Sequence, residues 1–336
     1  MILVTGGTGL VGSHLLLKLM EQGLQVRAIH RAESDLFKVE RIFSYYSDQA
    51  STLFKKIEWM VADINNIPQL EKAFEGVRQV YHCAALISFD PNDYEQLHKV
   101  NVEGTANIVN LCTANPIVKL CYVSSIAAIG KSNGEQKATE ENEWSHPHAS
   151  VYAISKTAAE LEVWRGSQEN VPVVVINPGI ILGPGFWDSG SGQLFHRAHR
   201  SPSYFPPGGT GFVAIADVVD IMTTLMESDI KNERFIVISE NLTYREILQK
   251  LTLAMEKDPP KKQIPYWALD ILMPLDWFWC LVTGNKRQLT SATVFSLKNR
   301  EIYSNDKLID RLDYNFEPLD RTIAFSTKKF MEENPL

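Results

Sequence analysis

A glycine-rich segment near the start of the chain, Thr5-Gly6-Gly7-Thr8-Gly9-Leu10-Val11-Gly12, constrains the fold more than any other feature. It lies between an apolar run at Ile2–Thr5 that predicts a strand and an apolar face at Val11–Gln22 that predicts a helix. Glycines at such a junction allow a tight turn, let backbone amides approach a pyrophosphate, and leave the helix N-terminus facing the anion. A glycine-rich turn without a ligand is the alternative, but the flanking elements favour a dinucleotide site.

Short β-branched runs continue to alternate with longer helical patterns along the first half of the chain. The expected strands are Ile2–Thr5, Gln25–His30, Ile57–Ala62, Gln79–Ala84, Ile117–Ser124 and Pro172–Asn177. Further helical patterns occupy Asp93–Ala114 and Val151–Ser167. Strands that alternate with crossover helices predict an α/β fold with a Rossmann-type, doubly wound parallel sheet.

The regular alternation ends after Pro178, where loops rich in Gly, Pro and Ser begin. A strand at Arg234–Ser239 and a helix that starts at the capping box Thr243-Tyr244-Arg245-Glu246 follow. We therefore expect an NAD(P)-binding Rossmann domain over residues 1–178, with a returning segment around 210–240. Residues 179–336 are expected to form a smaller, mainly substrate-binding part of mixed α/β structure.

The charge balance argues against nucleic acid as a partner. Lys and Arg number 33 and Asp and Glu 40, a net charge of −7, so no basic field exists to attract a phosphate backbone. The cysteines lack metal-ligand spacing, and His196-x-x-His199 has no third ligand nearby, so we expect no metal. The absence of a secretory signal before the first strand predicts a reducing, cytoplasmic setting.

One apolar stretch, Tyr266–Val282, raises the question of a membrane. It contains Asp270, Pro274 and Asp276 and is shorter than the roughly 20 apolar residues of a spanning helix, so we expect it not to span. Four alternatives stay open. They are a buried helix pair, a subunit contact, a lid over an apolar substrate, and an interfacial segment with three tryptophans at a lipid surface.

The residues after the second and third strands bear on which dinucleotide binds. NAD-binding folds usually carry an acidic residue after the second strand, but this chain has Arg31 there. A guanidinium matches phosphate geometry, so Arg31 predicts NADP(H), with NAD(H) possible if Glu33 or Asp35 serves the ribose instead. Asp63, after the third strand, would accept a hydrogen bond from the adenine amine, or would cap a turn.

Tyr152 and Lys156 stand four residues apart and therefore on one helix face. A nearby cation favours the phenolate, so we expect the pKa of Tyr152 to lie below its usual value near 10. Tyr152 would then exchange a proton with a substrate oxygen, and Lys156 would also hold the nicotinamide ribose. A surface pair formed by chance is the alternative.

The Ser124-Ser125 pair lies at the end of the fifth expected strand. Carboxyl ends of parallel strands open onto the ligand crevice, so a serine hydroxyl there can donate to the carbonyl that Tyr152 protonates. We favour Ser125 for this role and Ser124 as its support. A pair that only terminates the strand through local backbone bonds is the alternative.

Together these residues resemble the extended short-chain dehydrogenase/reductases over essentially the whole chain. The motifs that carry the resemblance are Thr5-Gly6-x-x-Gly9-x-x-Gly12, His82-Cys83-Ala84-Ala85, Asn101, Ser124-Ser125, Tyr152-x-x-x-Lys156 and Asn177-Pro178-x-x-x-x-Gly183-Pro184. Arg31 and the last motif are similar to the branch of dihydroflavonol reductases, aldehyde and ketone reductases and 3β-hydroxysteroid dehydrogenases. Two arginines typical of the sugar-nucleotide branch, at the Asn177 position and shortly before Phe212, are missing.

The resemblance implies Ser125, Tyr152 and Lys156 as the catalytic set. It implies a cofactor site made of Gly6, Thr8, Gly9, Leu10, Val11, Gly12, Arg31, Asp63, Ile64, Ala84, Ala85, Tyr152, Lys156 and Pro178. It also implies a homodimer through the helices that contain Asn101 and Tyr152.

The expected function is NADPH-dependent reduction of the carbonyl of an apolar aromatic, terpenoid or steroid-like molecule, or the reverse oxidation. The alternatives are an NAD-dependent 3β-hydroxysteroid dehydrogenase, a nucleotide-sugar epimerase or dehydratase, and a non-catalytic NADP(H)-binding regulator. Candidate residues that line the substrate pocket are Ile87-Ser88-Phe89, Trp144–His148, Phe186-Trp187, Tyr204-Phe205 and the aromatic segment Tyr266–Trp279. Core packing is the alternative for each of them.

Overall fold

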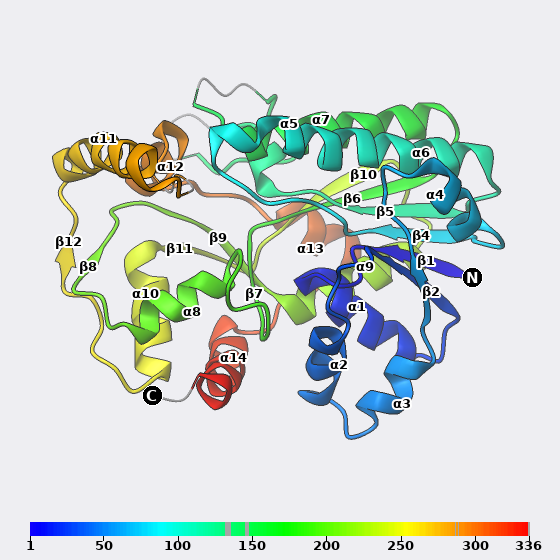
Figure 1. The fold of residues 1–336 in the computed structure, drawn as a ribbon, viewed down its shortest axis with the longest axis horizontal. Coiled ribbons are helices and arrows are strands. Elements are labelled where there is room, and N and C mark those ends of the chain that lie inside the picture. The colour runs from blue at the N-terminus through cyan, green and yellow to red at the C-terminus, as the bar shows by residue number, and fades with distance from the viewer. Residues whose placement is uncertain (132–135, 145–147, 286, 288, 335–336) are drawn as a thin grey trace.

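A seven-stranded parallel sheet forms the centre of the computed structural model, which describes residues 1–131, 136–144, 148–285, 287 and 289–334 (Figure 1). The strands, in spatial order, are β10 (Glu233–Val237), β6 (Val173–Pro178), β5 (Lys119–Val123), β4 (Gln79–His82), β1 (Ile2–Thr5), β2 (Val26–His30) and β3 (Glu58–Val61). The strand order reverses between β1 and β4, where ligands bind in doubly wound sheets. The predicted Rossmann-type sheet is confirmed.

Helices cover both faces of this sheet (Figure 1). One face packs against α1 (Leu10–Glu21), α2 (Phe37–Ser44), α3 (Ala50–Lys55), α9 (Ile215–Glu227) and α13 (Asp306–Leu312). The other packs against α4 (Ile67–Phe74), α6 (Gly104–Ala114) and α7 (Val151–Gln168). Two separate apolar clusters result, one on each side of the sheet, as a parallel sheet buried on both faces requires.

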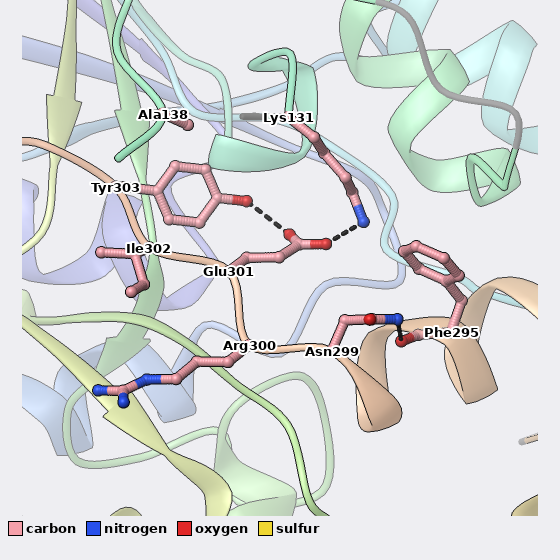
Figure 2. A pocket seen from close by; sticks show the side chains of 8 residues that line it. All are labelled: Lys131, Ala138, Phe295, Asn299, Arg300, Glu301, Ile302 and Tyr303. Carbon is pink, nitrogen blue, oxygen red and sulfur yellow. Dashed lines mark hydrogen bonds and ion pairs between the residues drawn. The ribbon is translucent and has the colours of Figure 1, made fainter. Parts of the chain in front are cut away.

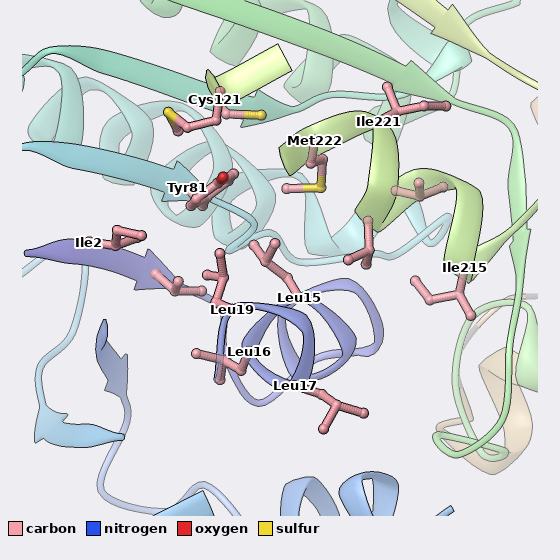
Figure 3. Packing of buried hydrophobic residues seen from close by; sticks show 14 of the residues in the cluster. Ile2, Leu15, Leu16, Leu17, Leu19, Tyr81, Cys121, Ile215, Ile221 and Met222 are labelled. Carbon is pink, nitrogen blue, oxygen red and sulfur yellow. The ribbon is translucent and has the colours of Figure 1, made fainter. Parts of the chain in front are cut away.

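Helix α1 shows why the sequence after the glycine segment forms a helix that packs on the sheet. Leu15, Leu16 and Leu19 are buried, and Leu15 points toward Met222 of the neighbouring α9 (Figure 3). Each buried leucine contributes about 1.5–3 kcal/mol of transfer free energy. This packing holds the N-terminus of α1 against the end of β1, where the glycine segment lies.

A nearly continuous helical path replaces the single helix predicted over Asp93–Ala114. It runs through the 3-10 turn η1 (Pro91–Asp93), α5 (Tyr94–Leu97), a π-helical stretch η2 (His98–Glu103) and then α6. π-Helical turns occur mostly at functional sites, and this one carries Asn101. The six predicted strands before Pro178 are present with bounds within about two residues of the prediction, the usual spread at element ends.

Smaller sheets and helices make up most of the remaining chain. A three-stranded sheet joins β7 (Ile180–Leu182), β9 (Gly209–Ala214) and β11 (Glu240–Thr243), and β8 (Tyr204–Phe205) pairs with β12 (Lys262–Gln263). Helices α8 (Gly192–His199), α10 (Tyr244–Ala254) and α14 (Leu319–Glu333) pack beside them. The predicted capping box is present, because Thr243 and Glu246 each accept a bond from the other's backbone amide. α9 and β10, at residues 215–237, return to the large sheet.

The apolar stretch at Tyr266–Val282 forms one helix, α11 (Tyr266–Thr283), which packs against α12 (Ser291–Lys298) at one end of the molecule (Figure 1). Most of its large apolar side chains are exposed, which excludes the buried helix pair among the four alternatives left open for this stretch. Within the described residues, none of the helices combines the length and apolar character needed to cross a membrane.

Candidate active site

The predicted site residues gather at the carboxyl ends of four neighbouring strands. The glycine segment follows β1, the loop that begins at Cys83 follows β4, Ser124 and Ser125 follow β5, and Pro178 ends β6. Because these strands are parallel and adjacent, their loops open on the same edge of the sheet. The expectation that distant motifs meet at this edge therefore agrees with the topology.

The glycine segment has the geometry of a phosphate-binding turn. Gly6 has a φ of +69°, and a Cβ atom there would lie 2.5 Å from the backbone nitrogen of Ala84. A Cβ atom at Gly12 would lie 2.1 Å from the carbonyl oxygen of Gly6. At Gly9, by contrast, a Cβ atom would meet only that oxygen, at an ordinary 3.5 Å.

This contrast supports a ligand beside Gly9. The fold itself demands glycine at Gly6 and Gly12, whereas at Gly9 the protein leaves room for a side chain. Gly9 is the N-cap of α1, and no side chain caps this helix end. The free backbone amides at the N-terminus of α1 are therefore suited to bind an anion, so the loop fits a pyrophosphate.

A buried chain of hydrogen bonds anchors this loop. Thr5 Oγ1 lies 2.6 Å from His82 Nδ1, and His82 Nε2 lies 2.9 Å from Thr105 Oγ1. Because Thr105 donates its own proton to the Asn101 carbonyl, it accepts from His82, which places the imidazole proton on Nε2. Burial lowers the pKa of His82 to about 3, so the ring is neutral at ordinary pH and serves to hold the loop.

Ser125 and Tyr152 meet across the site. Ser125 accepts a bond from the Ala127 amide at 3.1 Å, and its hydroxyl donates to the Tyr152 phenol oxygen. The ring of Phe89 contacts Tyr152 edge to face, with 5.6 Å between centroids. The local backbone bond and the bond to Tyr152 therefore coexist at Ser125.

The expected lowering of the Tyr152 pKa is wrong for the protein without a bound ligand. Burial raises the pKa of Tyr152 to about 12, against a smaller lowering by the Ser125 hydrogen bond. The ammonium group of Lys156 donates to Tyr122 Oη at 2.7 Å and to the Val123 carbonyl at 2.8 Å. Desolvation therefore outweighs the predicted effect of the cation, and Tyr152 is a protonated phenol at neutral pH.

Lys156 itself is perturbed. Its side chain is almost fully buried, and burial lowers its pKa to about 7, while the nearby Glu160 carboxylate opposes that shift. Lys156 therefore loses its proton far more readily than an exposed lysine does. Such perturbed groups in a cleft are typical of functional sites.

Glu160 is a buried carboxylate that was not predicted from the sequence. Its Oε2 accepts from Ser124 Oγ at 2.6 Å and from Asn177 Nδ2 at 2.9 Å, and its Oε1 lies 3.0 Å from Arg234 Nη1. Ser124 thus lies in a supporting network, as predicted. The spacing of Tyr152, Lys156 and Glu160 at i, i+4 and i+8 was the available signal, because it places all three on one helix face.

Replacing Glu160 with Gln is expected to lower the pKa of Lys156 below 7, because the variant removes the negative charge that stabilises the ammonium form. It also breaks the ion pair with Arg234, which we expect to cost about 3 kcal/mol of folding stability. A carbon-13 NMR titration of the Lys156 ε-methylene measures the first effect, and urea unfolding measures the second. Glu162→Gln, which removes a carboxylate paired with Arg165 on the same helix, is the control. An unchanged Lys156 titration would contradict the assigned charge coupling.

Asn101 ties the loop after β4 to α7. Its Oδ1 accepts from the Leu86 amide at 2.7 Å, and its Nδ2 donates to the Leu86 carbonyl at 3.0 Å and to Ser155 Oγ at 2.9 Å. These bonds span the π-helical stretch, the loop that carries Phe89, and the helix that carries Tyr152. Asn101 therefore positions the walls of the site.

The predicted adenine-side residues lie after β2 and β3. Arg31 is exposed and its Nε lies 3.2 Å from Glu33 Oε1, a surface pair worth about 1 kcal/mol at most. Asp63 Oδ1 accepts from the Asn65 amide at 2.8 Å, so this carboxylate serves a turn, the alternative left open for it. Ile64 is buried beneath α6.

The remaining predicted cofactor contacts border the same edge of the sheet. Thr8, Leu10 and Val11 are half-buried around the start of α1. Ala84 is half-buried and Ala85 exposed after β4, and Pro178 is buried at the end of β6.

The candidate lining residues divide into two groups. Ile87 and Phe89 are about half exposed in the loop after β4, and Phe89 contacts Tyr152, which agrees with a pocket wall. Trp187 and Phe205 are buried, and Trp187 packs on Phe195 within the core of the smaller part, so packing explains it. Within the stretch Trp144–His148, residues 145–147 lie outside the described residues.

A separate cavity of about 260 Å³ lies between Lys131 and the chain that follows α12 (Figure 2). Glu301 contacts Lys131, accepts from Tyr303 Oη at 2.7 Å, and so neutralises the cation inside the cavity. The Lys131 Nζ atom lies over the Phe295 ring, 4.2 Å from the ring centroid. Ser125, Tyr152 and Lys156 do not line this cavity, so it is not where their chemistry takes place.

Comparison with known proteins places these observations in context. Residues 2–238 match the model of the NAD dependent epimerase/dehydratase family. A putative dihydroflavonol 4-reductase of Synechocystis sp. is 31% identical, over 82% of this chain and 77% of that protein. Sterol demethylase protein B of Methylococcus capsulatus is 30% identical, over 78% of this chain and 77% of that protein.

Solved structures share the fold across the chain. The crystal structure of gox2253 superposes with a TM-score of 0.83 at 25% identity, over 100% of this chain and 99% of that one. UDP-glucuronic acid 4-epimerase from Bacillus cereus, in complex with NAD, superposes with a TM-score of 0.74 at 18% identity, over 98% and 96% of the two chains.

Proposed function

The chain belongs to the NAD-dependent epimerase/dehydratase family, whose members are oxidoreductases, and from this premise we propose that it reduces the carbonyl of an apolar small molecule with NADPH, or runs the reverse oxidation. The observation that carries the proposal is the hydrogen bond from Ser125 to a protonated Tyr152 at the end of β5. Lys156 stands one helical turn away, and the phosphate-binding turn follows β1 at the same sheet edge.

The residues of the chain have distinct roles in this reaction. NADPH, when bound along the glycine segment, supplies the hydride. Tyr152, protonated because burial raises its pKa to about 12, gives its proton to the carbonyl oxygen. With a substrate bound, the Ser125 hydroxyl would donate to the same carbonyl oxygen instead of to Tyr152, and would so stabilise the charge that develops there. Lys156 would hold the ribose of the bound cofactor near Tyr152, and Asn101 orients the walls around them.

The preference for NADP(H) rests on Arg31. It is exposed directly after β2, and its only ion pair among the described residues is the weak one with Glu33, so its guanidinium is available for a 2′-phosphate. Glu33 is the group that would favour NAD instead. We propose that Arg31 binds the 2′-phosphate and that the cofactor is NADP(H).

The apolar substrate class rests on the surroundings of Tyr152. Phe89 contacts its ring and Ile87 is exposed in the same loop. The sugar-nucleotide branch has an arginine where this chain has Asn177, and here Asn177 instead donates to the buried Glu160. The relative named sterol demethylase protein B favours a sterol or steroid substrate. The second candidate is therefore the NAD-dependent 3β-hydroxysteroid dehydrogenase.

Homodimerisation and a cytoplasmic setting stay predictions with partial support. Ile154 and Leu161 of α7 are exposed apolar residues seven positions apart, on one face of the helix expected to form the dimer contact. All four cysteines are free thiols, as a reducing compartment would leave them.

The test is oxidation of NADPH and NADH in parallel across aromatic aldehydes, ketones, dihydroflavonols and ketosteroids. We expect turnover with NADPH and an aromatic or polycyclic carbonyl. Tight NADPH binding without turnover of any compound would favour the non-catalytic regulator. UDP-sugar epimerisation without net NADPH oxidation would favour the sugar-nucleotide alternative.

In the same assay, Arg31→Ser is expected to raise the KM for NADPH about tenfold or more and to leave that for NADH nearly unchanged, because one charged hydrogen-bonding pair is lost. Arg41→Ser removes another exposed arginine, on α2, and is the control. Equal effects on both cofactors, or a wild-type preference for NADH, would refute the role given to Arg31.

A further inference from the structure

Helix α11 turns its apolar face outward. Leu269 and Cys280 are buried, and they mark the side of the helix that faces the protein. On the opposite side, five exposed apolar residues recur at intervals of three or four, which is the period of one helix face. They are Trp267, Ile271, Leu275, Phe278 and Val282, with exposed fractions of 66%, 52%, 57%, 59% and 68%.

The apolar surface extends beyond this row on both sides. Tyr266, Leu272, Trp277, Trp279 and Leu281 are exposed as well. The two acidic residues of the helix are engaged with the protein. Asp270 pairs with Lys298 of α12, and Asp276 accepts from the Leu289 amide at 3.1 Å. We call this set of ten exposed side chains the α11 surface.

The segment that contains α11 has a net positive charge although the whole chain is acidic. Residues 261–300 contain six basic and two acidic residues, a net charge of +4, in a protein of net charge −7. Lys261 and Lys262 are exposed just before the helix. An apolar helix flanked by cations is complementary to a lipid surface that carries negative charge.

We propose that the α11 surface docks this protein on an anionic lipid membrane, with the helix in the plane of the interface. None of the described helices is both long and apolar enough to cross a bilayer, so α11, with 18 residues, would lie on the surface. Tryptophan and tyrosine favour the boundary between water and hydrocarbon. Lipid solvates an apolar helix on several sides at once, whereas a second copy of the chain would bury one stripe and leave the flanking rows exposed.

The docked helix is tied to the candidate active site. The Arg287 amide, just after α11, donates to Asp90 Oδ2 at 3.0 Å, and the adjacent Phe89 contacts Tyr152. Docking would therefore hold the loop beside Tyr152 near the lipid, where apolar carbonyl compounds concentrate. This consequence rests on the proposed function, but the docking does not.

The test is sedimentation of the full chain with vesicles of phosphatidylcholine alone and of equal parts phosphatidylcholine and phosphatidylglycerol. We expect binding to both, stronger to the anionic vesicles, with quenching of tryptophan emission by brominated lipid. Combining Trp267→Ser, Ile271→Ser and Phe278→Ser is expected to lower the partition coefficient on the order of a hundredfold. Leu253→Ser, an equally exposed apolar residue on α10, is the matched control and should change nothing.

A second variant isolates the electrostatic part. Lys261→Gln with Lys262→Gln should lower binding to anionic vesicles about fivefold per residue and leave binding to phosphatidylcholine unchanged. Failure to sediment with either vesicle would overturn the proposal, as would unchanged vesicle binding by the triple variant. If light scattering instead shows that the triple variant dissociates an oligomer, with vesicle binding unaffected, the α11 surface is a contact between copies of the chain. These outcomes do not depend on turnover, so they are distinguishable from failure of the proposed function.

Discussion

Tyr152→Phe is expected to lower kcat for carbonyl reduction by about 10²- to 10⁴-fold, the usual contribution of a general acid. Phenylalanine keeps the ring that packs against Phe89 and loses only the hydroxyl that Ser125 contacts. The affinity for NADPH should change little, because the phosphate-binding turn is untouched. Steady-state kinetics on the best substrate and a fluorescence titration with NADPH measure the two quantities separately.

The matched control for this prediction is Tyr94→Phe, which removes the hydroxyl of an exposed tyrosine on α5. It should leave kcat and NADPH affinity at their original values. If Tyr152→Phe keeps activity within about threefold of the unmodified protein, Tyr152 is not the proton donor. If it abolishes NADPH binding as well, its role is structural.

Substitutions of two glycines in the same turn should both impair dinucleotide binding but differ in their effect on folding stability. Gly12→Ala places a Cβ atom 2.1 Å from the Gly6 carbonyl oxygen, so the backbone of Gly6 and Gly7 must move. We expect a loss of about 3 kcal/mol of folding stability, at the upper end of overpacking effects, together with loss of dinucleotide binding. Thermal unfolding and NADPH titration measure these effects.

Gly9→Ala should instead leave the protein folded and weaken the binding of the dinucleotide. Its Cβ atom meets only the Gly6 oxygen at 3.5 Å, and its φ of −101° is open to alanine, so the stability cost should stay near 1 kcal/mol. The methyl group occupies the path by which a pyrophosphate approaches α1, so the affinity for NADPH should fall more than tenfold. Unimpaired NADPH binding by Gly9→Ala would place the pyrophosphate elsewhere.

The periodicity of the chain was sufficient to predict the sheet. Runs such as Ile2–Thr5 and Pro172–Asn177 are apolar on both faces, as parallel strands buried between helices must be, and the helix at Val151–Ser167 differs from α7 by one residue. The π-helical stretch around Asn101 was not predictable, because it depends on the bonds of Asn101 to Leu86 and Ser155. Those partners are 15 and 54 residues away in the chain.

Site residues were predictable from the sequence where the residue type and its spacing indicate a particular chemistry. Ser125 and Tyr152 were identified in this way, and the structure brings them into contact. Glu160 and the contact of Lys156 with Tyr122 were missed. The spacing of Glu160 from Lys156 indicates a shared helix face but not burial, because a glutamate or lysine in a helix is usually solvated and only long-range packing buries it.

The sequence by itself determined the order of the strands along the chain, the position of the phosphate-binding turn and the pairing of Ser125 with a tyrosine near it. These follow from local periodicity, from the conformational freedom of glycine and from the parallel topology that alternating elements impose. Only the tertiary structure decided that Tyr152 is protonated, that Lys156 has a pKa of about 7 and that α11 faces outward. Each of these depends on how much water a side chain retains, which is set by neighbours far away in the chain.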